Sequence, residues 1–278
     1  MTSNLSLSDW LRGAEEQLKE AEVETARLDA LVLLSDELGQ DKSWCLAYSE
    51  HKLQMSQVNF LNTKVAQRAQ HTPLAYVRGH TEFYGREFAV TRRVLVPRPE
   101  SEAMIELLKQ GVGCRVSGVV ICDIGTGSGC LAITAKLELP ETDVYASDVD
   151  PLCLQTARAN ATNLHADITF LQGDLLQPYA LQQTADALLL LANLPYVPTN
   201  YPINQAAAHE PKLALFSGKD GLDEYKQLFA QVSELATKPL YIITESLLQQ
   251  HTTLIQIAFQ AGYKLVAEQN LAQMFERE

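Results

Sequence analysis

An apolar run that passes directly into a glycine-rich turn constrains the fold of this chain more than any other feature. The run is Val119–Asp123, and the turn is Gly125-Thr126-Gly127-Ser128-Gly129. From residue 118 onward, apolar runs alternate with helical patterns, and such an alternation predicts a parallel sheet covered by helices on both faces. We therefore expect a Rossmann-like α/β domain whose first strand leads into a ligand-binding turn.

The expected elements of this domain continue almost to the end of the sequence. Apolar runs predict five strands and a closing hairpin, at Val119–Asp123, Val144–Ser147, Ile168–Leu171, Ala187–Ala192, Leu240–Thr244, Tyr263–Glu268 and Ala272–Phe275. Periodic patterns predict helices at about residues 128–138, 151–163, 223–236 and 248–260. The length of 278 residues leaves room for a second domain before this one.

Residues 1–70 show a helical pattern without a catalytic motif. The first expected helix is capped by Ser6 or Ser8 and carries Trp10, Leu11, Ala14 and Leu18 on one face. The second runs from Glu22 to Leu38 and ends at Gly39, and a short third helix lies near Trp44–Tyr48. The fourth runs from about Gln57 to Ala69, is capped by Ser56, and points Phe60, Leu61, Val65 and Ala69 inward. Residues 80–96 alternate between apolar and polar types around Gly85, which predicts a β-hairpin. We expect a helical substrate-recognition domain over 1–72, a hairpin linker over 73–100 and the α/β domain over 101–278.

Charge and composition argue against two kinds of partner. The net charge is −12, whereas a general nucleic-acid-binding protein needs a basic face that neutralises phosphates. One modest cluster, Arg78, Arg86, Arg92, Arg93 and Arg98, lies within residues 71–100, and a solvated hairpin face explains it equally well. No run reaches the ~18 apolar residues of a membrane span. We expect neither a stable nucleic-acid partner nor a membrane partner.

The cysteines give no sign of a disulfide framework or a metal site. They are Cys45, Cys114, Cys122, Cys130 and Cys153, an odd number without a C-x-x-C pair. The first residues lack the basic start and apolar core of a signal peptide. We expect a cytoplasmic protein without a metal.

Carboxylates stand at the ends of the two strands that follow the glycine-rich turn. Asp148 is positioned to accept hydrogen bonds from both ribose hydroxyls of a nucleoside, and Asp174 can accept from an adenine amine. Glycines allow a ligand to approach the backbone, and the next helix presents free N–H groups. The turn reads GxGxG rather than GxGxxG, which favours S-adenosylmethionine over a dinucleotide. A tight turn without a ligand is the alternative for the glycines alone, but three signals at three successive strand ends favour the cofactor.

A four-residue motif, Asn193-Leu194-Pro195-Tyr196, follows the apolar run Ala187–Ala192. The Asn193 side-chain oxygen and the Leu194 carbonyl can accept both hydrogens of a planar NH2 group. Pro195 stiffens the turn, and Tyr196 offers a flat face for stacking. In isolation the motif would be a rigid turn, but after a cofactor turn it indicates methyl transfer to nitrogen. We therefore assign Asn193–Tyr196 as the catalytic residues and expect no general base, because the proton can leave after transfer.

The chain resembles a known family, the N5-glutamine methyltransferases of peptide chain release factors, over nearly its whole length. The motifs that carry the resemblance are Pro73-Leu74-Ala75-Tyr76, Phe83-Tyr84-Gly85, Leu95-Val96-Pro97-Arg98-Pro99-Glu100-Ser101-Glu102, Asp123–Gly129, Glu210-Pro211, Ala214-Leu215 and Gly218-Lys219-Asp220-Gly221-Leu222. The PRPE and E-P-x-x-A-L…G-x-D-G-L stretches are specific to the family, whereas many methyltransferases share the glycine-rich turn.

The resemblance implies a class I methyltransferase fold and S-adenosylmethionine as the cofactor. It implies cofactor contacts at Gly125–Gly129, Asp148, Leu175 and Asn193, and glutamine recognition by Asn193–Tyr196. Arg98-Pro99-Glu100 would wall the site, with Arg98 and Glu100 as candidate substrate contacts. The implied substrate is the glutamine of the Gly-Gly-Gln loop of release factors. We expect a monomer that acts in translation termination.

Three departures from the family pattern keep other functions open. The family has N-P-P-Y, whereas N-L-P-Y with Leu194 is typical of ribosomal-RNA adenine dimethyltransferases, so an adenine-N6 methyltransferase acting on RNA or DNA is the first alternative. Thr244-Glu245-Ser246-Leu247 lacks the usual glycine, and Asn270–Met274 matches D-L-A-G only loosely, which suggests a short last strand. The second alternative is a non-catalytic cofactor-binding scaffold, against which the intact Asn193, Pro195 and Tyr196 argue.

Overall fold

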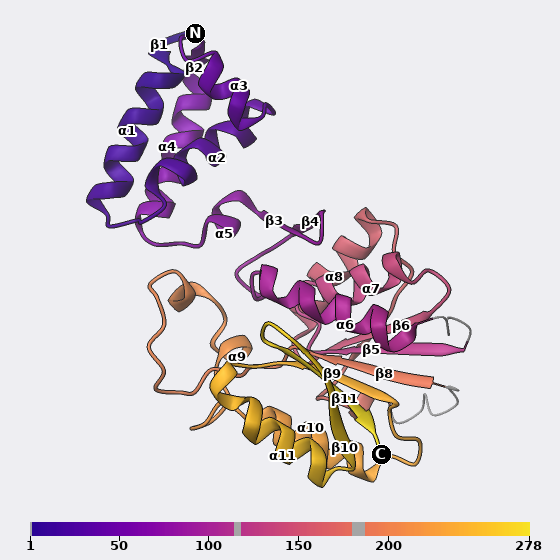
Figure 1. The fold of residues 1–278 in the computed structure, drawn as a ribbon. Coiled ribbons are helices and arrows are strands. Elements are labelled where there is room, and N and C mark those ends of the chain that lie inside the picture. The colour runs from indigo at the N-terminus through magenta and orange to yellow at the C-terminus, as the bar shows by residue number, and fades with distance from the viewer. Residues whose placement is uncertain (1, 114–117, 180–186) are drawn as a thin grey trace. The chain divides into compact units, whose positions relative to one another are not determined.

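The computed structural model describes residues 2–113, 118–179 and 187–278 (Figure 1). The chain divides into two compact units. The smaller unit holds the chain up to Gly79 together with Asn204–His209, and the larger holds His80–Ile203 and Glu210–Glu278. Among the helices of the described residues, none is both long and apolar enough to cross a membrane.

The smaller unit is a helical bundle with one short pair of strands. Its elements are β1 Thr2–Ser6, α1 Leu7–Glu20, α2 Ala26–Leu38, α3 Lys42–Ala47, β2 Lys52–Gln54, α4 Met55–Ala69, α5 Leu74–Arg78 and η3 Ala207–His209. Ser6 caps α1 by accepting from the Asp9 backbone N–H at 3.1 Å, as predicted. The predicted inward stripe of α1 is buried, and Gly39 ends α2 in the left-handed conformation. The helical character expected from the apolar spacing is therefore confirmed.

Several details of this unit differ from the sequence prediction. Helix α2 begins at Ala26 rather than Glu22, because the chain turns at Glu22 with φ +57°. Gln54 rather than Ser56 caps α4, and its N–H donates to the Gln57 side chain at 2.9 Å. Phe60 is 50% exposed, because Val58, Leu61 and Val65 already form the inward stripe of α4. Antiparallel pairing of β1 with β2 was not expected, and neither was α5.

The larger unit is a three-layer α/β structure. Its elements are β3 His80–Phe83, β4 Arg86–Ala89, η1 Pro99–Ser101, α6 Glu102–Val112, β5 Val119–Ile124, α7 Cys130–Glu138, β6 Asp143–Asp148, α8 Pro151–Asn163, β7 Thr169–Gln172, η2 Gln177–Tyr179, β8 Ala187–Ala192, α9 Lys212–Leu215, α10 Asp223–Glu234, β9 Tyr241–Glu245, η4 Leu248–Gln250, α11 His251–Gln260, β10 Tyr263–Gln269 and β11 Ala272–Arg277. The expected α/β fold is confirmed.

A seven-stranded sheet in the order β10-β11-β9-β8-β5-β6-β7 forms the middle layer. The strands from β9 to β7 are parallel, and β11 and β10 add an antiparallel hairpin at one edge. Strand β8 lies at the centre and is apolar throughout because both of its faces are covered. Helices α6 and α7 cover one face of the sheet, and α10 and α11 cover the other (Figure 1). Leu189 and Leu191 pack into the core on the first face, whereas Leu190 and Ala192 pack into the core on the second.

The predicted strands of the sheet agree with the structure to within a residue or two. The closing hairpin is longer than expected, because β11 continues to Arg277 and pairs with β9 along five residues. The predicted hairpin over 80–96 pairs only as far as Ala89. Val94 and Val96 are buried but lie in a turn that leads to Pro97, so their alternation reflects burial rather than pairing. Four cysteines are free, and Cys114 lies outside the described residues.

Asn160 of α8 fixes the hairpin segment to the glycine-rich turn. This side chain is 1% exposed, and its Nδ2 donates to the carbonyl oxygens of Ala89 and Ser128, both at 2.9 Å. Its Oδ1 accepts from the Ala89 N–H at 2.8 Å. The buried amide therefore has a partner for both hydrogens and for its oxygen, which is the usual condition for a buried polar group.

We predict that Asn160→Ala lowers the free energy of unfolding by about 1–3 kcal/mol, because the partners of the amide are left unsatisfied. Urea denaturation of both variants in parallel measures this. Asn163→Ala, at the exposed end of the same helix, is the matched control and should leave stability nearly unchanged. Equal effects of the two substitutions would show that the buried amide contributes nothing specific.

Candidate active site

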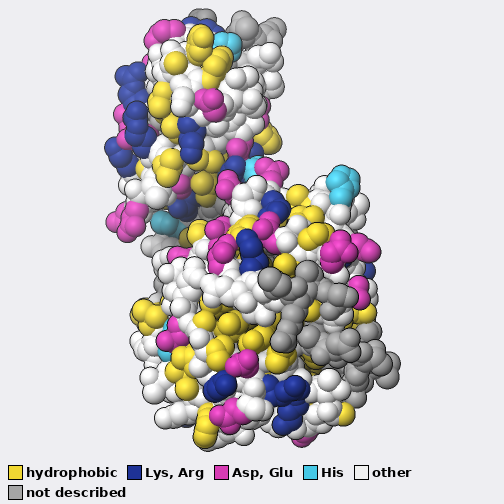
Figure 2. All heavy atoms as spheres, turned by 45° about the vertical axis from the view of Figure 1, so that its right-hand side comes forward, with side chains coloured by type: hydrophobic (Ala, Val, Ile, Leu, Met, Phe, Trp, Pro, Cys, Tyr) yellow, Lys and Arg dark blue, Asp and Glu magenta, His cyan; other side chains and the backbone are white. Residues whose placement is uncertain are grey.

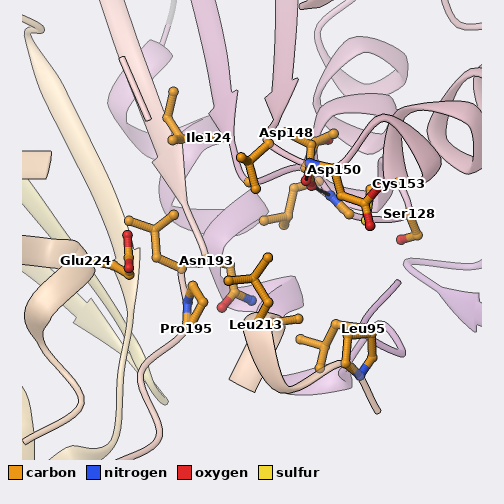
Figure 3. A pocket seen from close by; sticks show the side chains of 18 of the residues that line it. Leu95, Ile124, Ser128, Asp148, Asp150, Cys153, Asn193, Pro195, Leu213 and Glu224 are labelled. Carbon is orange, nitrogen blue, oxygen red and sulfur yellow. Dashed lines mark hydrogen bonds between the residues drawn. The ribbon is translucent and has the colours of Figure 1, made fainter. Parts of the chain in front are cut away.

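A cavity of about 310 Å³ lies at the carboxyl ends of the parallel strands (Figure 3). It is centred where β5 and β8 are neighbours, which is where the strand order reverses. Open α/β sheets bind ligands at this switch point because the two connections leave in opposite directions. The cavity belongs entirely to the larger unit.

The glycine-rich turn after β5 forms the first wall. Gly125 and Gly127 have φ +73° and +55°, a region that side chains other than glycine rarely adopt. A Cβ added at Gly125 would lie 3.3 Å from Leu194 Cδ2, so the turn and the Asn-Leu-Pro-Tyr motif touch. Thr126 Oγ1 donates to the buried Asp123 carboxylate at 2.6 Å, and burial raises the pKa of Asp123 to about 7.

Asp148, at the end of β6, presents a fixed carboxylate to the cavity. Its Oδ2 accepts from the Gly127 N–H and its Oδ1 from the Asp150 N–H, each at 2.9 Å. Burial raises the pKa of Asp148, and these two N–H donors oppose that rise by stabilising the charged form. Each carboxylate oxygen keeps a further lone pair, so the group can still accept two hydroxyl hydrogens from a ligand.

Asp174 and Leu175, after β7, line the same cavity. Asp174 Oδ2 accepts from Gln227 Nε2 at 3.1 Å, which anchors the carboxylate to α10. Leu175 is buried with φ +46° and adds an apolar surface. The wall after β7 is thus half polar and half apolar, as a nucleoside with a flat base requires.

The side chain of Asn193, which follows β8, is held by one hydrogen bond. Its Nδ2 donates to Ser101 Oγ at 2.9 Å, which leaves the amide oxygen Oδ1 unengaged within the described chain. The Leu194 N–H donates to the Tyr225 hydroxyl at 3.3 Å, and its carbonyl oxygen has no hydrogen bond among the described residues. Two acceptors, one from a side chain and one from the backbone, are therefore free at this wall.

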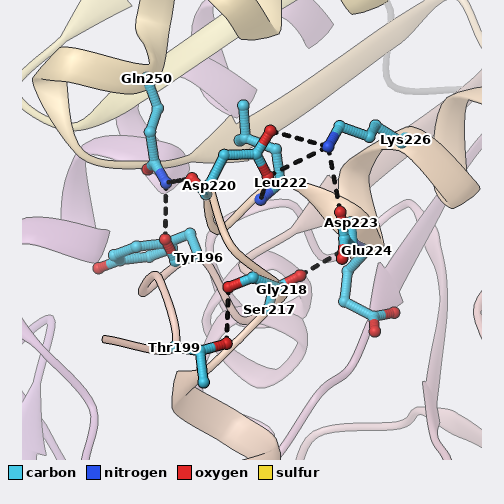
Figure 4. Close-up of polar contacts among 10 residues, drawn as sticks. All are labelled: Tyr196, Thr199, Ser217, Gly218, Asp220, Leu222, Asp223, Glu224, Lys226 and Gln250. Carbon is cyan, nitrogen blue, oxygen red and sulfur yellow. Dashed lines mark hydrogen bonds and ion pairs between the residues drawn. The ribbon is translucent and has the colours of Figure 1, made fainter. Parts of the chain in front are cut away.

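Tyr196 lies behind the cavity wall rather than on it. Its hydroxyl donates to Glu245 Oε1 at 3.0 Å. Its carbonyl accepts from Gln250 Nε2 at 2.7 Å (Figure 4). Gln250 also donates to the Asp220 carbonyl at 2.7 Å. At Gly221, a Cβ would lie 2.1 Å from the Tyr196 carbonyl oxygen. The Gly-Lys-Asp-Gly-Leu stretch thus packs directly on the motif.

Arg98 reaches the cavity from the segment before α6. Its guanidinium pairs with the Glu210 carboxylate, which also accepts from the Val96 N–H at 3.1 Å. Glu210 is 5% exposed, so this pair is a fixed part of the rim. The Pro-Arg-Pro-Glu and Glu-Pro stretches, far apart in the sequence, are joined by it.

Most of the predicted site residues line the cavity. Those that do are Arg98, Gly125, Thr126, Gly127, Ser128, Asp148, Asp174, Leu175, Asn193, Leu194 and Pro195. Gly129, Glu100 and Tyr196 are absent from the lining. Gly129 instead allows close packing, because a Cβ there would lie 3.1 Å from Ala157 Cβ.

The sequence reasoning missed three residues that hold the motif: Ser101, Tyr225 and Glu245. The Tyr225 hydroxyl lies 2.9 Å from the Ala192 carbonyl oxygen and 2.6 Å from that of Glu245, so it joins the ends of β8 and β9. A signal for Glu245 was present, because a carboxylate that ends an apolar strand points to the same edge of a parallel sheet. Ser101 and Tyr225 had no comparable signal.

Comparisons with known proteins cover both units. The family model described as PrmC N-terminal domain matches residues 9–79, and that described as Methyltransferase domain matches residues 121–209. A release factor glutamine methyltransferase of Koribacter versatilis is 36% identical and aligns over 83% of this chain and 82% of its own. One of Geobacter sulfurreducens is 31% identical, over 92% and 88%.

A solved structure shares the fold of the chain. The hMettl16 catalytic domain in complex with MAT2A 3′UTR hairpin 1 has a TM-score of 0.54 and 14% identity, over 81% of each chain. At that identity the likeness concerns the fold alone.

The fold and the cavity define a class I methyltransferase that uses S-adenosylmethionine. The residues present fit this cofactor, since glycines at positive φ, the Asp148 carboxylate and the apolar Leu175 surround one cavity. Two relatives above 30% identity align over most of both chains. The chain belongs to the family of release factor glutamine methyltransferases.

We predict that Asp148→Ala weakens the binding of S-adenosylhomocysteine by about 1–3 kcal/mol, because ligand hydroxyls lose their acceptor. Isothermal titration calorimetry measures the change. Asp143→Ala, at the exposed start of the same strand, is the matched control and should bind normally. Unchanged binding by Asp148→Ala would remove Asp148 from the cofactor site.

We also predict that Gly221→Ala lowers methyl transfer by roughly 10²-fold, the scale of an ångström-sized misplacement at a reacting centre. The new Cβ would displace the Tyr196 carbonyl. Gly262→Ala is the control, because its φ of +85° resembles the +77° of Gly221 while nothing lies within 4 Å. Similar losses of turnover in both variants would attribute the effect to backbone strain alone.

Proposed function

We propose that this chain transfers a methyl group from S-adenosylmethionine to the side-chain amide nitrogen, N5, of the glutamine in the Gly-Gly-Gln loop of peptide chain release factors. The observation that carries the proposal is the pair of free acceptors at Asn193 Oδ1 and the Leu194 carbonyl, on the wall of the cofactor cavity. A primary carboxamide has two N–H hydrogens, and each acceptor takes one of them.

The proposed role of the acceptors follows from the weak nucleophilicity of an amide nitrogen, whose lone pair is delocalised into its carbonyl. When bound, the cofactor supplies an electrophilic methyl group on a positively charged sulfur. Asn193 and Leu194 orient the nitrogen, and such positioning can supply up to ~7–11 kcal/mol of a barrier. As positive charge builds on nitrogen, the same two oxygens stabilise it. Solvent then takes the proton.

The names of the relatives support a release factor as the substrate. We propose that the smaller unit recognises this protein, that the enzyme acts as a monomer in the cytoplasm, and that its product is used in translation termination. Arg98 stands at the rim, where it can contact an arriving loop, while Glu100 is exposed beside it.

The Asn-Leu-Pro-Tyr motif makes adenine N6 the alternative substrate, because an exocyclic amine also carries two N–H hydrogens. The charge distribution argues against that rival. On the face shown in Figure 2, acidic and basic side chains are interspersed over the larger unit, and the net charge of the chain is −12. Relatives aligned along most of the chain favour glutamine.

A methyl-transfer assay with purified release factor and labelled cofactor tests the proposal. We expect one methyl group on N5 of the loop glutamine, located by peptide mass spectrometry, and no transfer when that glutamine is replaced by alanine. Structured RNA and adenine-containing DNA serve as the competing substrates. Transfer to either nucleic acid, without transfer to the protein, would overturn the proposal in favour of the rival.

We predict that Asn193→Ala lowers turnover by ~10²–10³, the scale of losing one preorganised polar partner at a reacting centre. Affinity for S-adenosylhomocysteine should change little, because the glycine-rich turn and Asp148 are untouched. Single-turnover kinetics and calorimetry measure the two effects separately. Asn163→Ala is the exposed control. Near-normal turnover by Asn193→Ala would contradict the proposed role of the two acceptors in positioning the substrate nitrogen.

A further inference from the structure

The two ends of the Asn193 amide have almost the same shape but opposite hydrogen-bonding character. Only one orientation serves the proposed function, with the oxygen toward the cavity and the NH2 toward Ser101. The reverse orientation would present N–H donors to a substrate that is itself an N–H donor. Because shape does not separate the two orientations, the hydrogen-bond partner must select between them.

Ser101 by itself makes no selection. A hydroxyl can accept a hydrogen bond or donate one, so it can face either end of an amide. In the structure Ser101 Oγ accepts from Asn193 Nδ2 at 2.9 Å, and Ser101 is only 3% exposed. Its own proton must then point to another acceptor, and the direction of that proton decides the orientation of Asn193.

Glu245 is the candidate for this acceptor. It ends β9, it is 1% exposed, and its Oε1 accepts from the Tyr196 hydroxyl at 3.0 Å. Its Oε2 has no hydrogen-bond partner in the described part of the chain. Burial raises the pKa of Glu245, and the Ser101, Tyr196 and Asn193 side chains oppose that rise because they favour the charged carboxylate. In its charged form this carboxylate only accepts, as its Oε1 does from the Tyr196 hydroxyl, so the proton of a neighbouring hydroxyl is drawn toward it.

We propose that Glu245, acting through Ser101, sets the orientation of Asn193, and that both are positioning residues of the active site. Glu245 takes the Ser101 proton, Ser101 Oγ therefore accepts from the Asn193 NH2, and Asn193 Oδ1 faces the cavity. The same carboxylate holds the Tyr196 hydroxyl, so one buried side chain acts on both ends of the four-residue motif. The inference deepens the proposed function and rests on it for its catalytic consequence.

Kinetics of Glu245→Gln and Ser101→Ala on release factor test that consequence. Glu245→Gln can donate to Ser101 Oγ, which frees the Ser101 proton to meet Asn193 Oδ1. Ser101→Ala removes the acceptor for the Asn193 NH2. We expect turnover to fall at least about tenfold in both, within the range for a misplaced reacting group, while cofactor affinity stays within twofold.

Two further variants separate positioning from general damage. Ser101→Thr keeps the hydroxyl and should restore most of the turnover lost in Ser101→Ala. Ser233→Ala removes a hydroxyl that donates to the Phe229 carbonyl at 2.9 Å, outside the cavity, and should match the parent. Adding Glu245→Gln to Asn193→Ala should cause no further loss, because the group being oriented is gone. Independent, multiplicative losses would overturn the inference.

A measurement on Asn193 itself keeps this inference separate from the proposed function. In protein labelled with ¹⁵N at asparagine side chains, the Asn193 NH2 signals are identified by their absence from Asn193→Ala. We expect these hydrogens to exchange slowly in the parent and in Ser101→Thr, and at least about tenfold faster in Ser101→Ala and Glu245→Gln. Unchanged exchange in both of the last two would overturn the inference. If transfer to glutamine fails while exchange responds as expected, only the proposed function falls.

Discussion

The active site depends on a single buried hydroxyl that joins the ends of two central strands. Tyr225 Oη lies 2.9 Å from the Ala192 carbonyl oxygen and 2.6 Å from that of Glu245, and it accepts from the Leu194 N–H at 3.3 Å. The phenol is fully buried within the core shared with α10, so it can hold these groups without competition from water.

Around that anchor, the segments that follow the strands support one another. The turn after β5 touches Leu194, and Gly221 packs against the Tyr196 carbonyl. Gln250 donates to the same carbonyl (Figure 4). Ser101 and Glu245 hold the polar side chains of the motif. The two acceptors that would bind a substrate amide, Asn193 Oδ1 and the Leu194 carbonyl, are therefore held by packed segments rather than by a free loop. Preorganisation of this kind is what electrostatic stabilisation of a reacting centre requires.

The parts of this architecture that follow local rules could be predicted from the sequence. Apolar runs buried on both faces identified the parallel strands, and glycine spacing identified the turn that contacts Leu194. Contacts between distant segments could not be predicted. The bond from Asn193 to Ser101 spans 92 residues, and nothing in a lone serine indicates which amide it will meet. The pairing of β1 with β2 was missed for the same reason, because the alternation of β2 covers only three residues and does not indicate a partner strand.

Leu194 separates two duties that a single side chain would otherwise combine. Its main-chain oxygen is free for recognition, while its buried side chain covers Gly125. The side chain at this position can therefore change in bulk to suit the neighbouring turn while the main-chain acceptor stays in place. The exchange of proline for leucine alters the stiffness and volume of the cavity wall but keeps the carbonyl oxygen that accepts the hydrogen bond. The residue type at this position is thus a poor guide to whether an enzyme of this kind methylates an amide or an amine nitrogen.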